Sequence, residues 1–145
     1  MKVIFGADHG GFKLKEALKP FVKKLGYEIE DMGTDSEEPV DYPDYAAAVS
    51  RKVAKGEGVG ILLCRSAAGM VMAANKIHGV RASAAFDVKS AQHSREHNDA
   101  NVLALSGDWL TPAKAKKIVK AWLQTPFSNE ERHARRIKKI MALEN

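Results

Sequence analysis

Short β-prone runs alternate with amphipathic helical patterns along this chain, and the alternation restricts its fold more than any other feature. Residues 59–63 give the clearest signal, because a continuous apolar run after a glycine-rich turn is typical of a strand buried on both faces of a parallel sheet. Strands that alternate with helices are joined by right-handed crossovers, which place helices on both faces of the sheet. We therefore expect an α/β sandwich.

The apolar spacing also predicts where the individual strands and helices lie. Strands are predicted at residues 3–5, 27–31, 59–63, 80–85 and 102–105, with Gly6 ending the first. Helices are predicted between them, at residues 14–25, 45–53, 67–77 and 88–96. Two further helices follow the last strand.

The first of these two begins at Thr111 and Pro112, a capping hydroxyl followed by proline at the first helical position. Ser128 and Glu131 have the spacing of a capping box, which predicts the start of the final helix. The expected buried side of that helix consists of Ile137, Ile140 and Met141.

The chain has 145 residues, the size of one compact domain, so we expect residues 1–145 to form a single domain. Its longest apolar stretch, residues 67–74, is far shorter than the roughly 18 residues of a membrane-spanning helix. The first eleven residues lack the apolar core of a signal peptide. These features predict a soluble cytoplasmic protein without a membrane partner.

The positive charge is concentrated near the C-terminus. The net charge is +5, and residues 111–145 contain nine basic and three acidic side chains. A basic C-terminal helix could bind nucleic acid, but it lacks interleaved aromatic residues, and a solvated basic face is the commoner meaning of such a helix. We therefore expect no nucleic-acid partner.

Ligands of parallel α/β sheets bind beyond the carboxyl ends of the strands. Cys64, the only cysteine, occupies such a position, before the amino end of a predicted helix whose free backbone N–H groups favour an anion. It is therefore a candidate nucleophile or base, with a buried structural cysteine as the alternative. Asp8 and His9 follow the first strand, so His9 can point into the same crevice.

Three other polar groups carry weaker signals. His97 and Asn98 lie between the fourth helix and the fifth strand, where an ordinary capping turn is the alternative to a functional role. Arg132 and Arg136 are one helical turn apart, a spacing suited to binding a phosphate, with a solvated basic face as the alternative. The remaining histidines, His78, His93 and His133, have no metal-ligand spacing, so no metal is expected.

A series of ordered segments covers nearly the whole chain. They are Gly6-Ala7-Asp8-His9-Gly10-Gly11-Phe12, Asp41-Tyr42-Pro43-Asp44-Tyr45, Cys64, Ala73-Ala74-Asn75-Lys76, Gly79-Val80-Arg81, His97-Asn98-Asp99-Ala100-Asn101-Val102-Leu103-Ala104 and Arg132-His133-Ala134-Arg135-Arg136. Together they resemble the type B ribose-5-phosphate isomerases and the related sugar-phosphate isomerases, which include galactose-6-phosphate isomerase.

The resemblance implies a Rossmann-like three-layer sandwich with a five-stranded parallel sheet, helices on both faces and no cofactor. It also implies a homodimer, with a tetramer as the alternative assembly, whose active sites are shared between subunits. We expect the C-terminal helix, at about residues 128–143, to pack on or reach the partner subunit.

The implied reaction interconverts ribose 5-phosphate and ribulose 5-phosphate through an enediolate, with the residue matching Cys64 moving a proton between C1 and C2. By the same resemblance His97 opens the sugar ring, and Asn98 holds sugar hydroxyls or the enediolate oxygen. Asp8 contacts the sugar and Tyr42 lines its pocket. The implied phosphate ligands are His9, Arg132 and Arg136. The developing enediolate needs hydrogen-bond donors, for which the sequence offers the backbone N–H groups of Ser66, Ala67, Ala68 and Gly69.

Two departures from the family pattern affect this expectation. The loop that begins at Arg65 lacks two glycines that are usual in the family, and alanine restricts the backbone there. Asp108 stands where the family commonly has an arginine that contributes to phosphate binding. Either Arg65 supplies the missing cation, or the natural substrate differs, with an allose- or galactose-type hexose 6-phosphate as the alternative. A non-catalytic sugar-phosphate-binding homologue is the remaining alternative.

Overall fold

The computed structural model describes residues 1–144, in which five strands form one parallel sheet with the order β2-β1-β3-β5-β4. The strands are β1 (Lys2–Ala7), β2 (Glu28–Asp31), β3 (Val59–Cys64), β4 (Ala82–Ala84) and β5 (Val102–Ser106). The helices are α1 (Phe12–Lys24), α2 (Tyr42–Ala54), α3 (Ala68–Ala74), α4 (Val88–Glu96), α5 (Pro112–Gln124) and α6 (Glu131–Ala142). The predicted single domain ends at residue 145, which lies outside the described residues.

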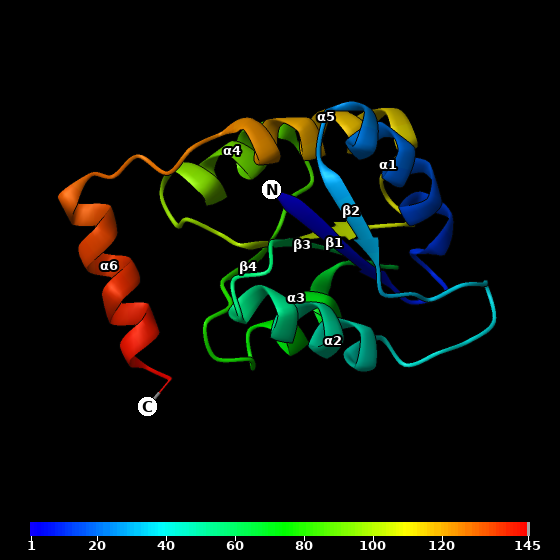
Figure 1. Cartoon of the computed structure of the whole chain (residues 1–145), viewed down its shortest axis with the longest axis horizontal. Coiled ribbons are helices and arrows are strands. Elements are labelled where there is room, and N and C mark those ends of the chain that lie inside the picture. Colours follow the sequence, from blue (N-terminus) through cyan, green and yellow to red (C-terminus); the bar gives the residue numbers. More distant parts are fainter. Residues whose placement is uncertain (145) are drawn as a thin grey trace.

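The sheet is the middle of three layers. Figure 1 shows α1, α4 and α5 over one face and α2 and α3 over the other. Neighbouring residues of a strand point to opposite faces, so Phe5 joins the cluster with Trp122 of α5, whereas Ile4 joins the cluster with Val49 of α2. The Rossmann-like sandwich expected from the sequence is confirmed, including β3 as a central, fully covered strand.

The strand order creates a crevice at the carboxyl edge of the sheet. From β1 the chain first turns outward to β2 and then returns to the other side of β1 as β3. The loops that leave β1 and β3 therefore run in opposite directions, which opens a gap between them, as in other open parallel sheets. The loop after β5 borders the same edge, because Cys64 pairs with Ser106.

Some predicted boundaries were wrong. β1 continues through Gly6, where an added Cβ would lie 2.6 Å from a methyl carbon of Val49, so the glycine permits close packing and does not end the strand. The helix predicted at residues 67–77 spans only Ala68–Ala74. Asn75 ends it, since its side-chain amide donates to the Ala82 carbonyl oxygen at 3.0 Å and accepts from the Ala82 N–H at 2.8 Å.

The final helix departs furthest from expectation. The predicted capping box is absent, because the Ser128 hydroxyl contacts the His133 imidazole and α6 begins at Glu131 without a side-chain cap. Figure 1 shows α6 set apart from the layers, beyond an extended segment that follows α5. The predicted buried side was also wrong for the chain alone: Ile140 is 46% exposed, and His133 is the one buried residue of α6.

Candidate active site

The Cys64 thiol lies at the carboxyl end of β3, only 5% exposed, at the wall of a cavity of about 290 Å³. Its Sγ accepts a hydrogen bond from the Ala67 N–H at 3.2 Å. Ala67 adopts the left-handed conformation, with φ of 74°, which turns this N–H back toward the sulfur. An alanine holds such a conformation at a cost of about 1–2 kcal/mol. The loop thus adopts a glycine-like shape despite the alanine at its turn.

Predicted site residues from the loops after β1 and β3, together with Tyr42 of α2, gather around this thiol. The cavity is lined by Asp8, His9, Tyr42, Cys64, Arg65, Ser66, Gly69 and Met72. The Asp8 carboxylate accepts the N–H groups of Gly10 and Gly11 at 2.9 and 3.2 Å, which shapes the loop after β1. Nδ1 of His9 accepts the Val40 N–H at 3.2 Å, which ties the loop before α2 to the same edge. We call Asp8, His9, Tyr42, Cys64 and the Ser66–Gly69 loop the thiol half-site.

Arg65 lies at the border between this cavity and a second one of about 250 Å³, which His9, Lys13, Glu37 and Asp108 also line. Its guanidinium contacts the Asp108 carboxylate at 3.2 Å, and its side chain is 62% exposed. An exposed ion pair contributes little stability, about 0–1 kcal/mol. The two residues with unexpected charges are therefore in contact, and Asp108 holds Arg65 beside both cavities.

The loops that carry this pair are packed backbone to backbone. The Gly107 N–H donates to the Cys64 carbonyl oxygen at 2.8 Å, and the Asp108 N–H donates to that of Arg65 at 3.3 Å. A Cβ at Gly107 would lie 2.2 Å from the Gly10 carbonyl oxygen, so the loops after β1 and β5 touch without intervening side chains.

His97 and Asn98 lie at the opposite edge of the sheet. They precede β5, whose first residue Val102 pairs with Gly60 near the beginning of β3, whereas Cys64 pairs with Ser106 at the end of β5. Four strand residues separate these levels, which corresponds to about 13 Å along the strand direction. One chain therefore does not bring His97 and Cys64 into a single cavity.

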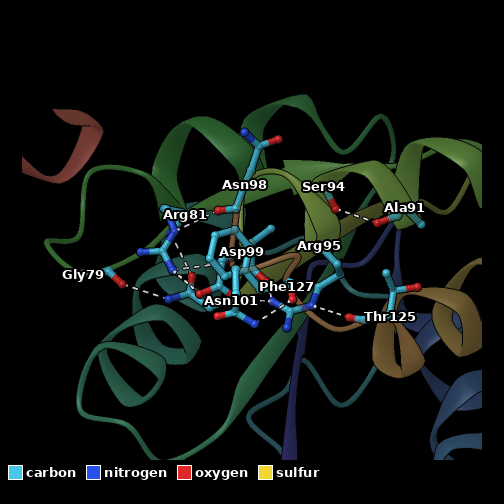
Figure 2. A network of polar contacts seen from close by, with 12 residues as sticks. Gly79, Arg81, Ala91, Ser94, Arg95, Asn98, Asp99, Asn101, Thr125 and Phe127 are labelled. Atoms are coloured by element: carbon cyan, nitrogen blue, oxygen red, sulfur yellow. Dashed lines mark hydrogen bonds and ion pairs between the residues drawn. The ribbon is translucent and has the colours of Figure 1, made fainter. Parts of the chain in front are cut away.

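Two arginines hold the turn that carries His97 and Asn98 (Figure 2). The Arg81 guanidinium donates to the carbonyl oxygens of Asn98 and Asp99 at 3.1 and 2.8 Å. Arg95 donates to the Ala100 carbonyl oxygen at 2.6 Å and to the Asp99 carboxylate at 3.0 Å. In Figure 2 the Asn98 amide points away from this network. Its backbone is fixed while its amide is presented outward.

The His97 imidazole packs against two others. Its ring centroid is 4.0 Å from that of His93 in α4 and 4.1 Å from that of His133 in α6. This contact brings the first turn of α6, with Arg132 and Arg136, to the His97 turn. We call His97, Asn98, Arg132 and Arg136 the histidine half-site.

Burial lowers the pKa of His133 below its ordinary value of 6.5. The nearby His97 imidazole and the guanidiniums of Arg132 and Arg136 act in the same direction, while Glu130 opposes them. His133 is therefore mainly neutral near pH 7.

Sequence reasoning missed the residues that support the histidine half-site, namely His93, His133, Arg81 and Arg95. The four-residue spacing of His93 and His97 was an available signal, since it places two side chains on one helix face. His133 gave no such signal, because its contact with His97 joins distant segments of the chain.

Among residues 1–144, no group of three or more His, Cys, Asp or Glu side chains is arranged to hold a metal ion. None of the described helices is both long and apolar enough to cross a membrane.

Comparison with known proteins agrees with the geometry. The family model described as Ribose/Galactose Isomerase matches residues 3–140. Ribose-5-phosphate isomerase B of Escherichia coli is 44% identical over 144 residues, which cover 99% of this chain and 96% of the relative.

Two solved structures are also similar. The type B ribose 5-phosphate isomerase of Trypanosoma brucei has a TM-score of 0.95 and 48% identity, covering 98% of this chain and 97% of that one. Ribose-5-phosphate isomerase B of Mycoplasma genitalium with bound ribulose-5-phosphate has a TM-score of 0.94 and 37% identity, covering 99% and 95%.

Proposed function

Since the chain belongs to the ribose/galactose isomerase family, we propose that it interconverts ribose 5-phosphate and ribulose 5-phosphate, with Cys64 as the base. The chain is an isomerase of the type B ribose-5-phosphate isomerase class. The observation that carries the proposal is the Cys64 thiol at the wall of a cavity lined by Asp8, His9 and Tyr42. Cys64 also belongs to the apolar cluster with Ala67 and Met70, and its place in the cavity wall is what distinguishes it from a cysteine enclosed by apolar side chains alone.

In the proposed reaction, the Cys64 thiolate removes the proton from C2 of the open-chain aldose. The electron pair of that bond forms the C1=C2 double bond, and negative charge develops on O1. The proton then returns to C1, while the proton of the C2 hydroxyl passes to O1, leaving a carbonyl at C2. The backbone N–H groups of Ser66, Ala67, Ala68 and Gly69 are the proposed donors to the charged oxygen.

The proposed site is completed by a second copy of this chain. Ring opening by His97 requires it to reach the sugar that Cys64 deprotonates, yet these residues lie at opposite edges of one sheet. The exposed apolar side of α6 supports the same assembly, because Ile140 lacks cover within the described chain. A homodimer would join the thiol half-site of each subunit to the histidine half-site of the other, through the helix predicted at about residues 128–143.

The phosphate of the substrate is assigned to His9 from one subunit and to Arg132 and Arg136 from the other. Arg65 is the proposed additional cation, since it borders both the thiol cavity and the second cavity. Binding would draw its guanidinium from Asp108 toward the phosphate, because a guanidinium binds phosphate in a bidentate manner.

A hexose 6-phosphate is the second candidate substrate. The Arg65–Asp108 pair favours it, because Asp108 would repel a phosphate bound close to it and would tolerate one held farther away. Competition between ribose 5-phosphate and allose or galactose 6-phosphate would separate the two substrates.

The first test is turnover of ribose 5-phosphate by the purified protein without added metal, beside Cys64→Ala and Cys64→Ser. Proton NMR in heavy water would detect deuterium at C2 of the recovered aldose. The proposal expects turnover and deuteration by the wild type and loss of both in the two variants. Deuteration that persists in both variants would assign the base to another residue.

A further inference from the structure

The geometry points to His133 as a positioning residue for His97, the proposed ring-opening group. This inference rests on the proposed function, because it concerns the step that supplies the open-chain sugar to Cys64. His133 comes from α6, and its ring stacks on that of His97 with 4.1 Å between centroids and 28° between planes. His93 also packs against His97, with 4.0 Å between centroids and a tilt of 35° between the ring planes.

A ring packed against two neighbouring rings turns less freely about its χ2 bond. Imidazole side chains otherwise have a broad preference for this torsion. Contact with the His133 ring therefore restricts the directions in which the His97 nitrogens can meet a ligand. The stack therefore selects an orientation of His97 before substrate arrives, which is the usual contribution of a supporting residue to proton transfer.

His133 is itself held in place. It is 4% exposed, and its Nδ1 lies 2.7 Å from the Ser128 hydroxyl. The Ser128 N–H donates to the Glu96 carbonyl oxygen at 3.1 Å, next to the end of α4 that carries His97. Arg95 of the same helix donates to the Thr125 carbonyl oxygen at 3.3 Å. The segment before α6 is thus attached to α4, and it delivers the His133 ring to His97.

The groups around His133 favour its neutral form. His93 faces His97 from α4, and His133 faces it from α6, while Glu130, Arg132 and Arg136 are the charged groups near His133. Burial, together with the nearby guanidiniums, lowers the pKa of His133 below 6.5. A neutral His133 ring packs against His97 without placing a positive charge beside it.

This arrangement fits the proton movements of ring opening. The C1–O4 bond of the furanose ring breaks as the anomeric hydroxyl loses its proton to a base and O4 receives a proton from an acid, so the C1 carbonyl forms without net change in protonation. His97 performs both transfers at its ring edge. If the His97 nitrogens pointed in another direction, ring opening would slow, whereas the proton exchange at Cys64 would be unaffected.

Two substrates separate these steps. Ribose 5-phosphate must be opened, whereas ribulose 5-phosphate cannot close into a five-membered ring because its O5 carries the phosphate. In heavy water, conversion of ribose 5-phosphate reports ring opening, and deuterium incorporation at C1 of ribulose 5-phosphate reports the base alone. Absence of both signals in the wild type would contradict the proposed function itself, whatever the variants of His133 do.

The variants are His133→Ala, which removes the stacked ring, and His133→Phe, which keeps a flat ring without nitrogens. We expect His133→Ala to lower kcat for ribose 5-phosphate about 30-fold, with KM changed less than about threefold. Deuteration of ribulose 5-phosphate should stay within about threefold of the wild type. His133→Phe should restore ribose 5-phosphate conversion to within about threefold of the wild type.

The inference is overturned if His133→Phe is as impaired as His133→Ala, since the nitrogens of His133 would then act themselves. Equal losses of both reactions, or no loss in either, would also overturn it. Should His133→Ala fail to fold, Ser128→Ala removes the hydroxyl that holds the ring, with Ser128→Thr as its matched control. The NMR chemical shifts of the His97 ring protons, which report the stacked His133 ring, should change in Ser128→Ala and not in Ser128→Thr.

Discussion

The thiol half-site and the histidine half-site are built by different means. Around Cys64 the backbone provides most of the structure: the Ala67 N–H contacts the sulfur, and the loops after β1 and β5 touch through Gly10 and Gly107. Around His97 long side chains provide it, through the arginines that clamp the turn and the rings that stack. The backbone-built half suits a fixed base, while the side-chain-built half depends on contacts between distant segments.

The two half-sites also differ in how much of each is enclosed within a single chain. The thiol half-site has a cavity of its own, whereas α6 of the histidine half-site leaves its apolar side exposed. The thiol half-site thus has the base and an enclosure but lacks the ring-opening group. If the two half-sites meet only between subunits, a variant of one half-site should be complemented by a subunit in which that half-site is intact.

The largest expected effect is this complementation between subunits. Cys64→Ala and His97→Ala should each be nearly inactive alone, because each homodimer would have two defective sites. Refolded together in equal amounts, they should recover about a quarter of the wild-type activity, since about half the dimers are mixed and each has one intact site. The measurement is ribose 5-phosphate turnover after joint refolding.

The control for this experiment pairs Cys64→Ala with Asp8→Ala, which damages the same half-site. Joint refolding should then restore nothing, because neither site of the mixed dimer is intact. Recovery in this control, or none in the first mixture, would contradict a site shared between subunits.

A second experiment tests the charged contacts at the end of β2, the strand that pairs with β1 beside the thiol half-site. Asp31 at the end of β2 contacts the fully buried Lys15 at 2.7 Å and accepts the Gly33 N–H at 2.9 Å. Burial opposes ionisation of Asp31, but hydrogen bonds from Lys15, Lys19 and the Gly33 N–H hold its pKa below the ordinary 3.8. Asp31→Asn should lower the free energy of unfolding by about 3 kcal/mol at pH 7, because it leaves the buried Lys15 ammonium with only the longer contact to Glu16 at 3.5 Å.

The pH dependence of that loss has a defined sign. A carboxyl whose pKa is lowered by folding stabilises the folded state above its unfolded pKa, and this contribution is lost as the pH falls through the folded pKa. The difference between wild type and Asp31→Asn should therefore be constant near neutrality and shrink below about pH 4. Denaturant unfolding across this range is the measurement, with the exposed Asp35→Asn as control. A difference that grows toward acid would contradict the assignment.

A third prediction concerns the rim of the thiol half-site. If Asp108 restrains a phosphate-binding Arg65, the two variants should act in opposite directions. Arg65→Ala should raise KM for ribose 5-phosphate about tenfold, and Asp108→Asn should lower it about threefold, because the guanidinium is released and a repulsive charge is lost. Steady-state kinetics would measure both, with Lys120→Ala on α5 as a control for general charge. Changes of the same sign would indicate that the pair only joins two loops.

The smallest expected effect is a change in stability, predicted for one backbone position near each half-site. Ala67→Gly relieves a left-handed alanine but removes a buried methyl group, so stability should rise by only about 0.5 kcal/mol. Ala91→Gly in α4, the helix that leads to His97, removes a buried methyl group from a regular helix and should destabilise by about 1.5 kcal/mol. Thermal unfolding would measure both, and two changes of the same sign would contradict strain at Ala67.

Much of the fold could be predicted because its signals are local. The apolar run of β3, the helical spacing of α4 and the cap at Thr111, which accepts the Lys114 N–H at 3.2 Å, each lie within a few neighbouring residues. The grouping of Asp8, His9 and Cys64 was predictable for a similar reason, since carboxyl ends of adjacent parallel strands meet at one edge.

The sequence by itself therefore determined the elements, the parallel sheet and the edge at which the thiol lies, because periodicity and capping act over short distances along the chain. Only the tertiary structure decided that the His133 ring stacks on that of His97 and that Arg65 contacts Asp108. These contacts join residues far apart in sequence, through the order of strands and the path of the segment before α6. Local patterns carry no information about which distant surfaces meet, and packing of the whole chain supplies it.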